Sequence, residues 1–543
     1  MKNYLLLLFL LVFSGPAALR AQTWQWAMPW QGPLPAYDAV KLLPDGSGNT
    51  IVAGGFTGTL TLGSTTLSSR GGSDAFVAWL SPTGTWLRAF SVGGSGNEVI
   101  NALALDAAGN VVVAGYFGGT VAFGTSTLSK PNGQSDMFVG RISPAGTWLQ
   151  AVQASAAVTP SAPRAYCVAA APNGDIVVAG TFLPTAITIG SFTLTNASCC
   201  VSTDAFVARL NAAGTWTQAL RLGNTQYETP VGLAIDHTNT VVLAVNGSFG
   251  IQFPNVNGQF VARLDAAGTW TQAVPVPEYI AAMQLAPDGD VVLAGFFSSL
   301  VATFGSITLP NAYPDGQSTD IYLARLSPAG TWRQATRLGG PHSDYVRALA
   351  LDAAGNTVLA GRFGGASTQL GSVTLTNSNP TGAFGDAFVA RQNAAGSWQA
   401  LPTRGLNTET IDQISFDGTD GVVVLGAFDY PTVSFGPTTL STPNNVTAGF
   451  VARVGGLVTA AGAPAPATVA TLSPNPAREQ VLVRWPTALP AGRPLQLLDA
   501  LGRCVREQAV AARATEARLP LTGLPSGLYL VRCGPARGRL LVE

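Results

Sequence analysis

The sequence predicts an all-β protein: a seven-bladed β-propeller closed by an N-terminal strand, followed by a small C-terminal β-sandwich. Three observations support this: a unit that repeats along most of the chain, an apolar β-branched strand in each copy, and a tryptophan after a tight turn. Residues 106–154 are the clearest copy. Repetition at this period is typical of propellers and solenoids, and the unit shows no helical periodicity.

Each copy predicts four antiparallel strands. The second strand is the β-branched run 111–115, which begins after a Gly-Asn turn. The first strand, 100–105, alternates apolar and small residues, as expected for a strand with one covered face. The third strand is 137–142, and a fourth begins at Thr147 after a Ser-Pro-Ala-Gly turn. Residues 121–128 predict an extra hairpin or an elaborated loop.

These strands recur along the chain. Copies of the second strand begin at Ile51, Val111, Ile176, Val241, Val291, Thr357 and Val422. The third strand recurs at Phe76, Phe138, Phe206, Phe260, Tyr322, Phe388 and Phe450. The tryptophan of the fourth strand recurs as Trp86, Trp148, Trp216, Trp270, Trp332 and Trp398. The seventh copy therefore lacks its fourth strand.

The missing strand is expected at the N-terminus. Residues 23–27 have the fourth-strand pattern, and Trp24 precedes Trp86 by the spacing that separates Trp86 from Trp148. Closing the ring with this strand would protect the edges of the first and last blades. An open solenoid would instead carry polar capping repeats, which the sequence does not show.

The chain begins with a predicted secretory signal peptide, residues 1–21. Lys2 precedes the apolar run 4–13, and small residues stand before Gln22. The run is too short for a transmembrane anchor, and no cysteine follows the cleavage site as a lipoprotein would require. The predicted organisation is then a seven-repeat propeller at 22–456, an Ala/Pro-rich linker at 457–470 and a second domain at 471–543.

The composition limits the partners. Only 11% of residues are charged, and the 29 basic residues equal the 29 acidic ones. Zero net charge argues against nucleic acid or an anionic membrane as the main partner. No integral membrane segment is expected in the mature chain.

The copies differ most between their second and third strands, as in 183–203 and 298–319. The fourth copy, near 225–276, is the shortest and lacks a Gly-Ser-x-Thr-Leu segment. The other six carry this segment at Gly63, Gly124, Gly190, Gly305, Gly371 and Gly436. Insertions of this kind collect on one face of a propeller, so binding specificity is expected in these loops.

The sequence assigns no catalytic, cofactor-binding or metal residue, and no cofactor. His237 and His342 have neither metal-ligand spacing nor a neighbouring nucleophile motif. Asp265 lies three residues before Gly268, whereas the Asp-box turn of sialidases has its Asp two residues before Gly, so a structural turn is expected. Two carboxylates paired for glycoside hydrolysis cannot be recognised from sequence, because their separation depends on the fold.

Two repeated sets of charges are expected to be structural. The arginines recur in the third strand of six blades, where a ring for an anionic sugar is the alternative: Arg141, Arg209, Arg263, Arg325, Arg391 and Arg453. The turn acids are too few per turn for calcium, which needs six to eight oxygens: Asp45, Asp106, Asp288, Asp352 and Asp417.

The five cysteines allow pairing in an exported protein. Cys504 with Cys533 is one possible bridge, which would contribute roughly 3–4 kcal/mol in the loop-entropy model. Cys167 with Cys199 or Cys200 is another, and unpaired buried roles are nearly as plausible.

The C-terminal domain contains the motif Ser-Pro-Asn-Pro-Ala at 473–477, followed by the segments 499–503 and 521–532, in this order at the end of the chain. Through these segments it resembles the type A sorting domain of the type IX secretion system of Bacteroidota. The resemblance implies translocation across the outer membrane by the type IX machinery through residues 471–543. Removal of the domain and release or surface attachment of the protein would follow. More loosely, residues 35–456 resemble the SBBP-type propeller repeat, which carries no assigned activity.

Two functions remain open from the sequence. The first is a secreted or cell-surface propeller without enzymatic activity that binds a glycan or protein, or serves as a scaffold. The alternative is a secreted polysaccharide hydrolase or lyase, which an asymmetric cluster of carboxylate, Tyr and Arg at one mouth of the channel would support.

Overall fold

The computed structural model divides the chain into two compact units, Arg20–Val458 and a unit that contains Thr459–Glu543. The predicted signal peptide and the predicted linker lie outside the described residues. The structure describes residues 23–30, 40–154, 163–183, 186–196, 202–223, 227–247, 258–313, 318–352, 354–378, 385–405, 409–418, 421–429, 431–442, 447–455, 471–484, 495–498, 504–510, 515–533 and 536–542.

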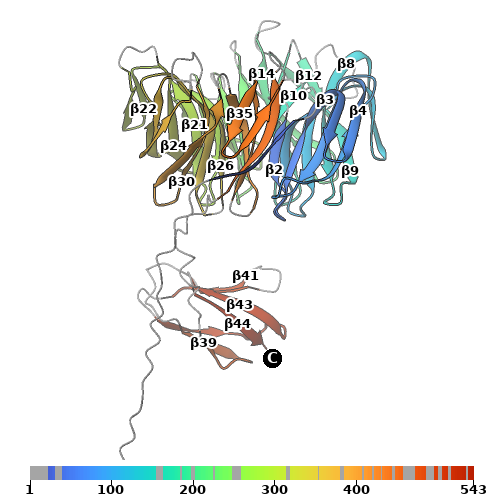
Figure 1. The fold of residues 1–543 in the computed structure, drawn as a ribbon. Helices are drawn as coiled ribbons and strands as arrows, with labels where there is room; N and C mark the ends of the chain where they lie inside the picture. Colours follow the sequence, from blue (N-terminus) through green and yellow to red (C-terminus); the bar gives the residue numbers. More distant parts are fainter. Residues whose placement is uncertain are drawn as a thin grey trace, which may run out of the picture. The chain divides into compact units, whose positions relative to one another are not determined.

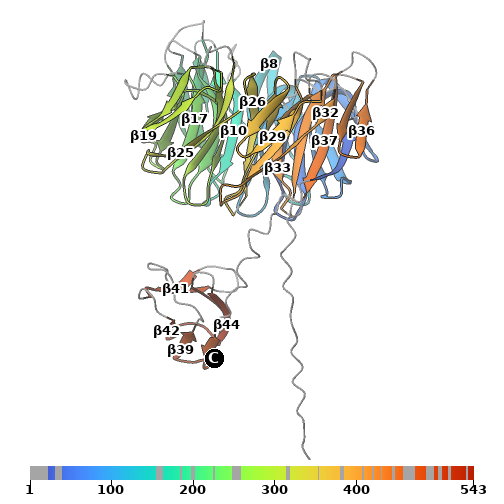
Figure 2. The same ribbon diagram turned by 60° about the vertical axis from the view of Figure 1, so that its left-hand side comes forward.

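The larger unit contains seven four-stranded antiparallel sheets, here called blades 1 to 7 in chain order (Figures 1 and 2). Blade 1 consists of β2 (Lys41–Pro44), β3 (Thr50–Leu62), β4 (Thr65–Leu80) and β5 (Trp86–Val92). Blade 2 consists of β6 (Val99–Leu105), β7 (Val111–Phe123), β8 (Ser126–Ile142) and β9 (Trp148–Gln153). Blade 3 consists of β10 (Arg164–Ala170), β11 (Ile176–Phe182), β14 (Asp204–Leu210) and β15 (Trp216–Leu222). The second strands begin within one residue of their predicted positions.

The next three blades repeat this order. Blade 4 consists of β16 (Thr229–Ile235), β17 (Val241–Asn246), β18 (Phe260–Leu264) and β19 (Trp270–Pro275). Blade 5 consists of β20 (Tyr279–Leu285), β21 (Val291–Phe297), β24 (Asp320–Leu326) and β25 (Trp332–Leu338). Blade 6 consists of β26 (Asp344–Leu351), β27 (Thr357–Phe363), β30 (Ala387–Gln392) and β31 (Trp398–Pro402).

Blade 7 combines both ends of the unit, as predicted. Its strands are β33 (Glu409–Phe416), β34 (Val422–Phe428), β37 (Ala448–Gly455) and β1 (Thr23–Pro29). β1 runs antiparallel to β37, with Trp24 opposite Val454 and Met28 opposite Val451. The first strands of the blades contact one another in a cycle that returns from β33 to β2.

Trp24 occupies the position of the tryptophans in the other blades. Its ring meets Phe435 edge-on at 4.9 Å and 80°. Trp148 meets Phe123 in the same way at 5.0 Å and 77°, and Trp332 meets Phe304 at 4.9 Å and 78°. The N-terminal strand therefore reproduces the packing of an ordinary fourth strand.

The Gly-Ser-x-Thr-Leu segments form the predicted extra hairpins, which contact the fourth strands. In blades 1 and 2 they are extensions of β3–β4 and β7–β8. In blades 3, 5, 6 and 7 they are separate hairpins: β12 (Ala186–Ile189) with β13 (Phe192–Thr195), β22 (Val301–Phe304) with β23 (Ile307–Pro310), β28 (Ser367–Leu370) with β29 (Val373–Thr376), and β35 (Thr432–Phe435) with β36 (Thr438–Ser441). The short strand β32 (Arg404–Gly405) pairs with β35 in the last of these. Their turn needs glycine: Gly124 has φ of 61°, and a Cβ there would lie 2.9 Å from Trp148 Cβ.

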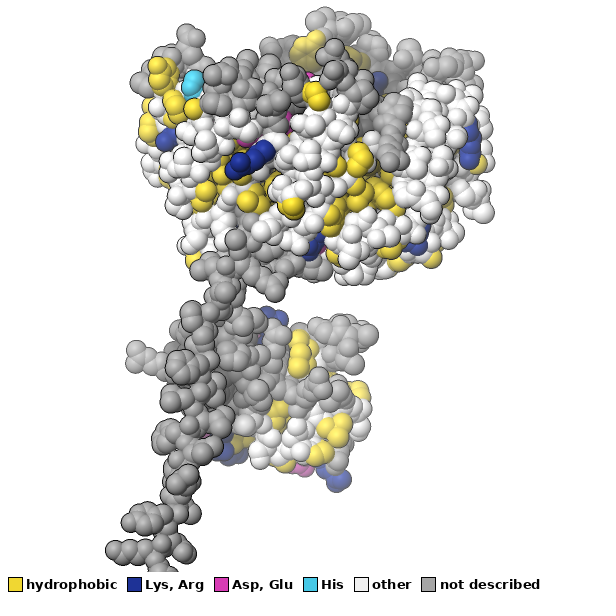
Figure 3. Space-filling model, in the orientation of Figure 1, with side chains coloured by type: hydrophobic (Ala, Val, Ile, Leu, Met, Phe, Trp, Pro, Cys, Tyr) yellow, Lys and Arg dark blue, Asp and Glu magenta, His cyan; other side chains and the backbone are white. Residues whose placement is uncertain are grey.

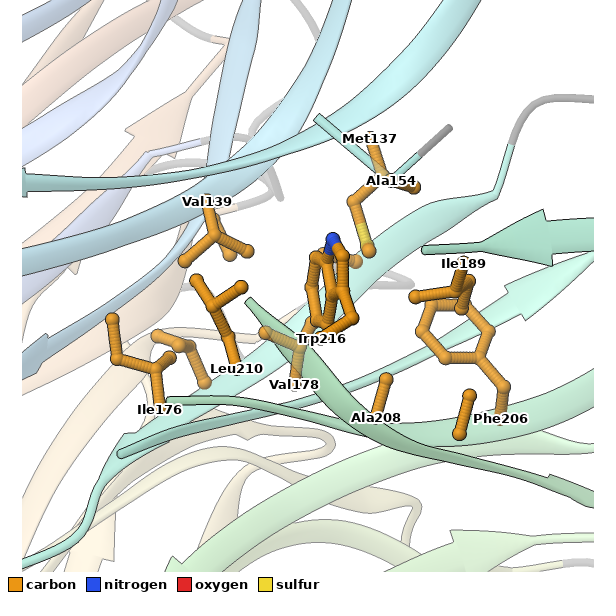
Figure 4. Packing of buried hydrophobic residues seen from close by; sticks show 14 of the residues in the cluster. Met137, Val139, Ala154, Ile176, Val178, Ile189, Phe206, Ala208, Leu210 and Trp216 are labelled. Atoms are coloured by element: carbon orange, nitrogen blue, oxygen red, sulfur yellow. The ribbon is translucent and has the colours of Figure 1, made fainter. Parts of the chain in front are cut away.

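The apolar strands explain the core, because the middle strands of each blade are covered on both faces. Figure 4 shows the packing between blades 2 and 3, where Met137 and Val139 of β8 face Val178, Leu210 and Trp216 of the next blade. Charged side chains are sparse on the side of this unit drawn in Figure 3. Within the described residues, no helix has the length and apolarity needed to cross a membrane.

The smaller unit consists of two sheets around one apolar core that includes Val481, Leu495, Leu519, Val531 and Leu540. One sheet contains β38 (Thr471–Ser473), β39 (Gln480–Arg484) and β42 (Glu516–Pro520). The other contains β41 (Cys504–Gln508), β40 (Leu495–Leu498), β43 (Gly527–Cys533) and β44 (Ala536–Val542).

The strand register argues against the bridge considered between Cys504 and Cys533. β40 lies between their strands, with Leu498 opposite Cys504 and Leu495 opposite Cys533. Strands are about 4.8 Å apart and rise about 3.3 Å per residue, so the two Cα atoms are separated by more than about 10 Å. A disulfide requires Cα atoms within about 7 Å.

Candidate functional site

The repeated arginines form ion pairs within their own blades, in agreement with the structural role expected from the sequence. Each lies on a third strand, and its guanidinium contacts the acid in the turn between the first and second strands of the same blade. The pairs are Arg141–Asp106 at 3.1 Å, Arg209–Asp175 at 3.4 Å, Arg263–Asp236 at 3.4 Å, Arg325–Asp288 at 2.6 Å and Arg453–Asp417 at 2.6 Å. Arg391 in blade 6 interacts electrostatically with Asp352. They do not form a binding ring.

The carboxylates of the turn acids also accept hydrogen bonds within their own turns. Asp106 Oδ1 accepts the backbone N–H groups of Ala108 and Asn110 at 3.0 and 2.9 Å, a pattern typical of tight Asx turns. Asp265 accepts the N–H of Thr269 at 2.7 Å, so its carboxylate also bonds within its own turn. Across the described ranges, no group of three or more His, Cys, Asp or Glu is placed to hold a metal ion.

Within the described part of the chain, the two histidines and Cys167 do not belong to a cluster of this kind. His237 and His342 are exposed, in the turn before β17 and in the loop before β26. Cys167 lies on β10 with a free thiol, and burial raises its pKa to about 12. A thiol with this pKa is almost fully protonated at neutral pH and is a poor nucleophile. Cys199 and Cys200 lie outside the described residues.

Buried carboxylates face one another between neighbouring blades. Asp320 begins the third strand of blade 5, and Asp344 begins the first strand of blade 6, and both are fully buried. Asp344 accepts the N–H of Gly340 at 2.8 Å, and Asp320 pairs with Arg337 at 3.2 Å. Burial, with a smaller effect from Asp320, raises the pKa of Asp344 to about 7. Burial raises the pKa of Asp320 as well.

This carboxyl pair predicts a pH-dependent stability. Because Asp344 binds a proton more tightly in the folded state, its contribution is fully present below about pH 4 and is lost as pH rises through about 7. A rise of about three pKa units corresponds to roughly 4 kcal/mol at most. We expect Asp344→Asn to be more stable than wild type at pH 8, with the difference shrinking at pH 5. Denaturant unfolding at both pH values measures this.

The exposed Asp429 provides the control. Asp429→Asn should give equal stability differences at both pH values. A pH-independent difference between Asp344→Asn and wild type would contradict the assignment.

One cavity that opens onto the central channel has a volume of about 700 Å³. It lies where the first strands begin and the second strands end. We call it the mouth cavity. Its aromatic lining is Tyr116, Tyr166, Tyr279, Phe296 and Tyr345, and its charged lining is Lys41, Arg164, Arg347, Arg362 and Asp412. The adjoining stretch of channel, about 290 Å³, is bounded by residues of all seven first strands.

The lining residues occupy equivalent positions at which the copies differ. One position directly follows a Gly of the second strand, or Val245 in blade 4: Gly55, Tyr116, Thr181, Asn246, Phe296, Arg362 and Ala427. Another is the extra residue of a β-bulge in the first strand: Asn101, Tyr166, Val231, Ala281, Arg347 and Asp412. Bulges redirect side chains and are frequent beside functional sites.

Side chains from neighbouring blades meet at these positions. Tyr279 stacks on Phe296 at 4.7 Å and 28°, and Phe296 meets Tyr345 of the next blade edge-on at 5.2 Å. The Arg362 guanidinium lies 5.0 Å from the ring of Tyr345. We call these four residues the aromatic shelf. In blades 2 and 3, the Arg164 guanidinium lies 5.2 Å from the ring of Tyr116.

A smaller cavity of about 380 Å³ lies near the turns of blades 1 and 2. There Trp79 takes the position that arginine has in the other blades, and the Arg88 guanidinium lies 3.8 Å from its ring. The Asp45 carboxylate in this cavity is used by its own turn, because it accepts N–H groups of Ser47 and Asn49. The mouth cavity is the larger of the two and combines residues of several blades.

The sequence predicted that specificity lies in the loops between the second and third strands, but it did not point to the residues that line the mouth cavity. Alignment of the second strands at their Gly would have shown one position that ranges from Gly to Arg. The bulge positions had no such signal, because an extra residue in a strand is visible only from the register. The described parts of the loops between second and third strands form the hairpins that cover the fourth strands. Specificity in the rest of those loops stays a prediction.

The fold and this cavity define a β-propeller-like protein. Residues 471–539 match the secretion system C-terminal sorting domain. The chain therefore carries a type IX sorting domain and is a secreted or cell-surface attached protein. Within this domain, Asn475 of the recognised motif accepts the N–H of Leu541 at 2.9 Å, which fastens the motif to the last strand.

A search of curated proteins found no match. Among solved structures, the chain is similar to the Neurospora crassa Pan2 WD40 domain, with 8% identity, 80% of this chain and 96% of that chain covered, and a TM-score of 0.42. It is also similar to PorZ, an essential bacterial surface component of the type IX secretion system of Porphyromonas gingivalis. That match has 10% identity, 95% and 100% coverage and a TM-score of 0.23. At these TM-scores, the architecture rests on the sheet topology above.

Proposed function

We propose that this chain is an extracellular binding protein: a closed seven-bladed propeller that is exported by type IX secretion and binds a glycan at its mouth cavity without cleaving it. The observation that carries this proposal is the asymmetric mouth cavity itself. Its aromatic and charged residues lie where the copies differ, whereas the repeated charges are used within the blades. Residues 22–456 would form the propeller, 457–470 the linker and 471–543 the sorting domain.

A glycan fits the lining better than a flat protein surface does. The cavity is concave, and its volume of about 700 Å³ lies within the range of small-ligand sites. Tyr279 and Tyr166 remain 45% and 39% exposed, although large apolar rings are normally covered. Partly exposed rings offer flat faces for the C–H side of sugar rings, and tyrosine adds a hydroxyl for their hydroxyl groups.

A polysaccharide lyase or hydrolase is the second candidate, because the mouth cavity contains the cluster of Tyr, Arg and carboxylate that such an enzyme would need. Two observations weigh against it. Among the described residues that line the cavity, Asp412 is the one carboxylate, whereas glycosidases generally use two. Burial, which outweighs the effect of Arg164, raises the pKa of Tyr116, and this disfavours Tyr116 as a general base at neutral pH.

A glycan array and a polysaccharide-cleavage screen on the secreted protein test this proposal. We expect binding without release of reducing ends or unsaturated products. The variant Tyr279→Ala/Tyr345→Ala should lose at least about tenfold in affinity, or roughly 1.4 kcal/mol, because it removes most of the aromatic shelf. Tyr313→Ala, an exposed tyrosine that does not line the cavity, is the matched control.

Two results would contradict the proposal. Cleavage of a polysaccharide that the aromatic variant no longer cleaves would establish the enzyme. Equal binding by wild type and the aromatic variant would place the ligand elsewhere.

A further inference from the structure

The charges of the mouth cavity are far from balanced. Its lining carries four cationic side chains and one carboxylate, in a chain whose 29 basic and 29 acidic residues cancel. The repeated arginines and acids account for many of the other charges as pairs inside the blades. The excess positive charge therefore lies at a concave site to which several blades contribute side chains.

Two of these cations belong to the aromatic shelf or adjoin it. Arg362 lies directly opposite Tyr345 in the pairing of β27 with β26. Arg347 is the bulge residue of the same β26 and is exposed. Blade 6 thus contributes two guanidinium groups to the cavity that Tyr345, Phe296 and Tyr279 also line.

A second combination of ring and cation lies in blades 2 and 3, where Arg164 adjoins Tyr116 and the bulge residue Tyr166 follows on the same strand. Blade 4 separates the two combinations in chain order. Its equivalent residues contribute no charge: Val231 is the bulge residue, and Asn246 exchanges hydrogen bonds of 2.8 and 3.0 Å with the backbone of Ile280.

From this arrangement we infer that the mouth cavity selects anionic saccharides, in which carboxylate or sulfate groups project from the sugar rings. This inference rests on the proposed function and names its ligand class. An aromatic face binds the C–H side of a pyranose, and an adjacent guanidinium binds a planar carboxylate or a sulfate through two parallel N–H donors. The repetition of this combination fits a ligand with more than one acidic unit. Carboxylate and sulfate share this chemistry, so the choice between them is left to the experiment.

Equilibrium binding of the secreted protein to matched probes tests the inference. The probes are an oligogalacturonate, its fully methyl-esterified form, a heparin oligosaccharide and poly-glutamate. We expect tight binding of the oligogalacturonate or the heparin oligosaccharide, at least tenfold tighter than binding of the neutral ester, and weakening with added salt. Tighter binding of the oligogalacturonate would show that carboxylates suffice for recognition, and tighter binding of the heparin oligosaccharide would show that sulfates add to it.

Arg347→Gln/Arg362→Gln should lower the affinity for the acidic probe at least tenfold and leave binding of the methyl ester unchanged. Arg347→Lys/Arg362→Lys should restore only part of it, because lysine keeps the charge but lacks the planar fork. Arg333→Gln, an exposed arginine on the fourth strand of blade 5, is the control and should bind as wild type does.

Three outcomes would overturn the inference. Equal affinity for the acid and its methyl ester would leave a glycan-binding protein without charge selection, so the proposed function would survive. Equal or tighter binding of poly-glutamate through the same arginines would indicate a protein partner instead. Binding of no saccharide would remove the proposed function together with the inference.

Discussion

Deletion of residues 22–32 is expected to lower the melting temperature of the larger unit by at least about 3 °C. The deletion removes β1, exposes the edge of β37 and takes away the buried Trp24. Truncation of a buried tryptophan alone costs about 3–5 kcal/mol, and each kcal/mol corresponds to roughly 1 °C in a unit that spans Arg20–Val458. Thermal unfolding followed by tryptophan fluorescence measures the change.

Point variants separate the strand from the length of the N-terminus. Trp24→Ala should lose about 3–5 kcal/mol, and Gln25→Ala, whose side chain is exposed on the same strand, should change stability by less than about 0.5 kcal/mol. An unchanged melting temperature after the deletion would refute the exchange of β1 into blade 7.

Removal of residues 471–543 should hold the protein in the periplasm. The segment that matches the type IX sorting domain would be lost with these residues. Cell fractionation and surface labelling of producing cells measure the location of the truncated chain. Fusion of residues 456–543 to a periplasmic reporter is the matched control and should carry the reporter to the surface. Normal export of the truncated chain would contradict the assignment.

Signals local in the sequence predicted the fold well. The β-branched runs such as 111–115 mark strands that are covered on both faces, so they stand out without knowledge of their neighbours. Trp24 was placed in blade 7 because it has the turn and spacing of the other tryptophans, and the register of β1 with β37 confirms this. The structural role of the repeated arginines followed from the same reasoning, since a residue present in most copies usually serves each of those copies.

Features that depend on how strands pair or how blades meet could not be predicted from these local signals. Arg347 and Tyr166 line the mouth cavity because a bulge redirects them, and a bulge is a property of strand pairing. Asp320 and Asp344 interact because two blades meet, although they are 24 residues apart. The separation of Cys504 from Cys533 depends on β40 lying between their strands, which alternating hydrophobicity does not specify.

Binding by a variant whose mouth residues are replaced by those of its own repeats tests the central claim most directly. The variant Tyr345→Thr/Arg347→Val/Arg362→Thr adopts residues that stand at the equivalent positions, Thr229, Val231 and Thr181. The ring and its internal ion pairs should remain intact, so we predict an unchanged melting temperature together with loss of binding to the best array glycan in titration calorimetry. A variant that folds and binds this glycan with wild-type affinity would contradict the claim that residues at positions where the copies differ form the site.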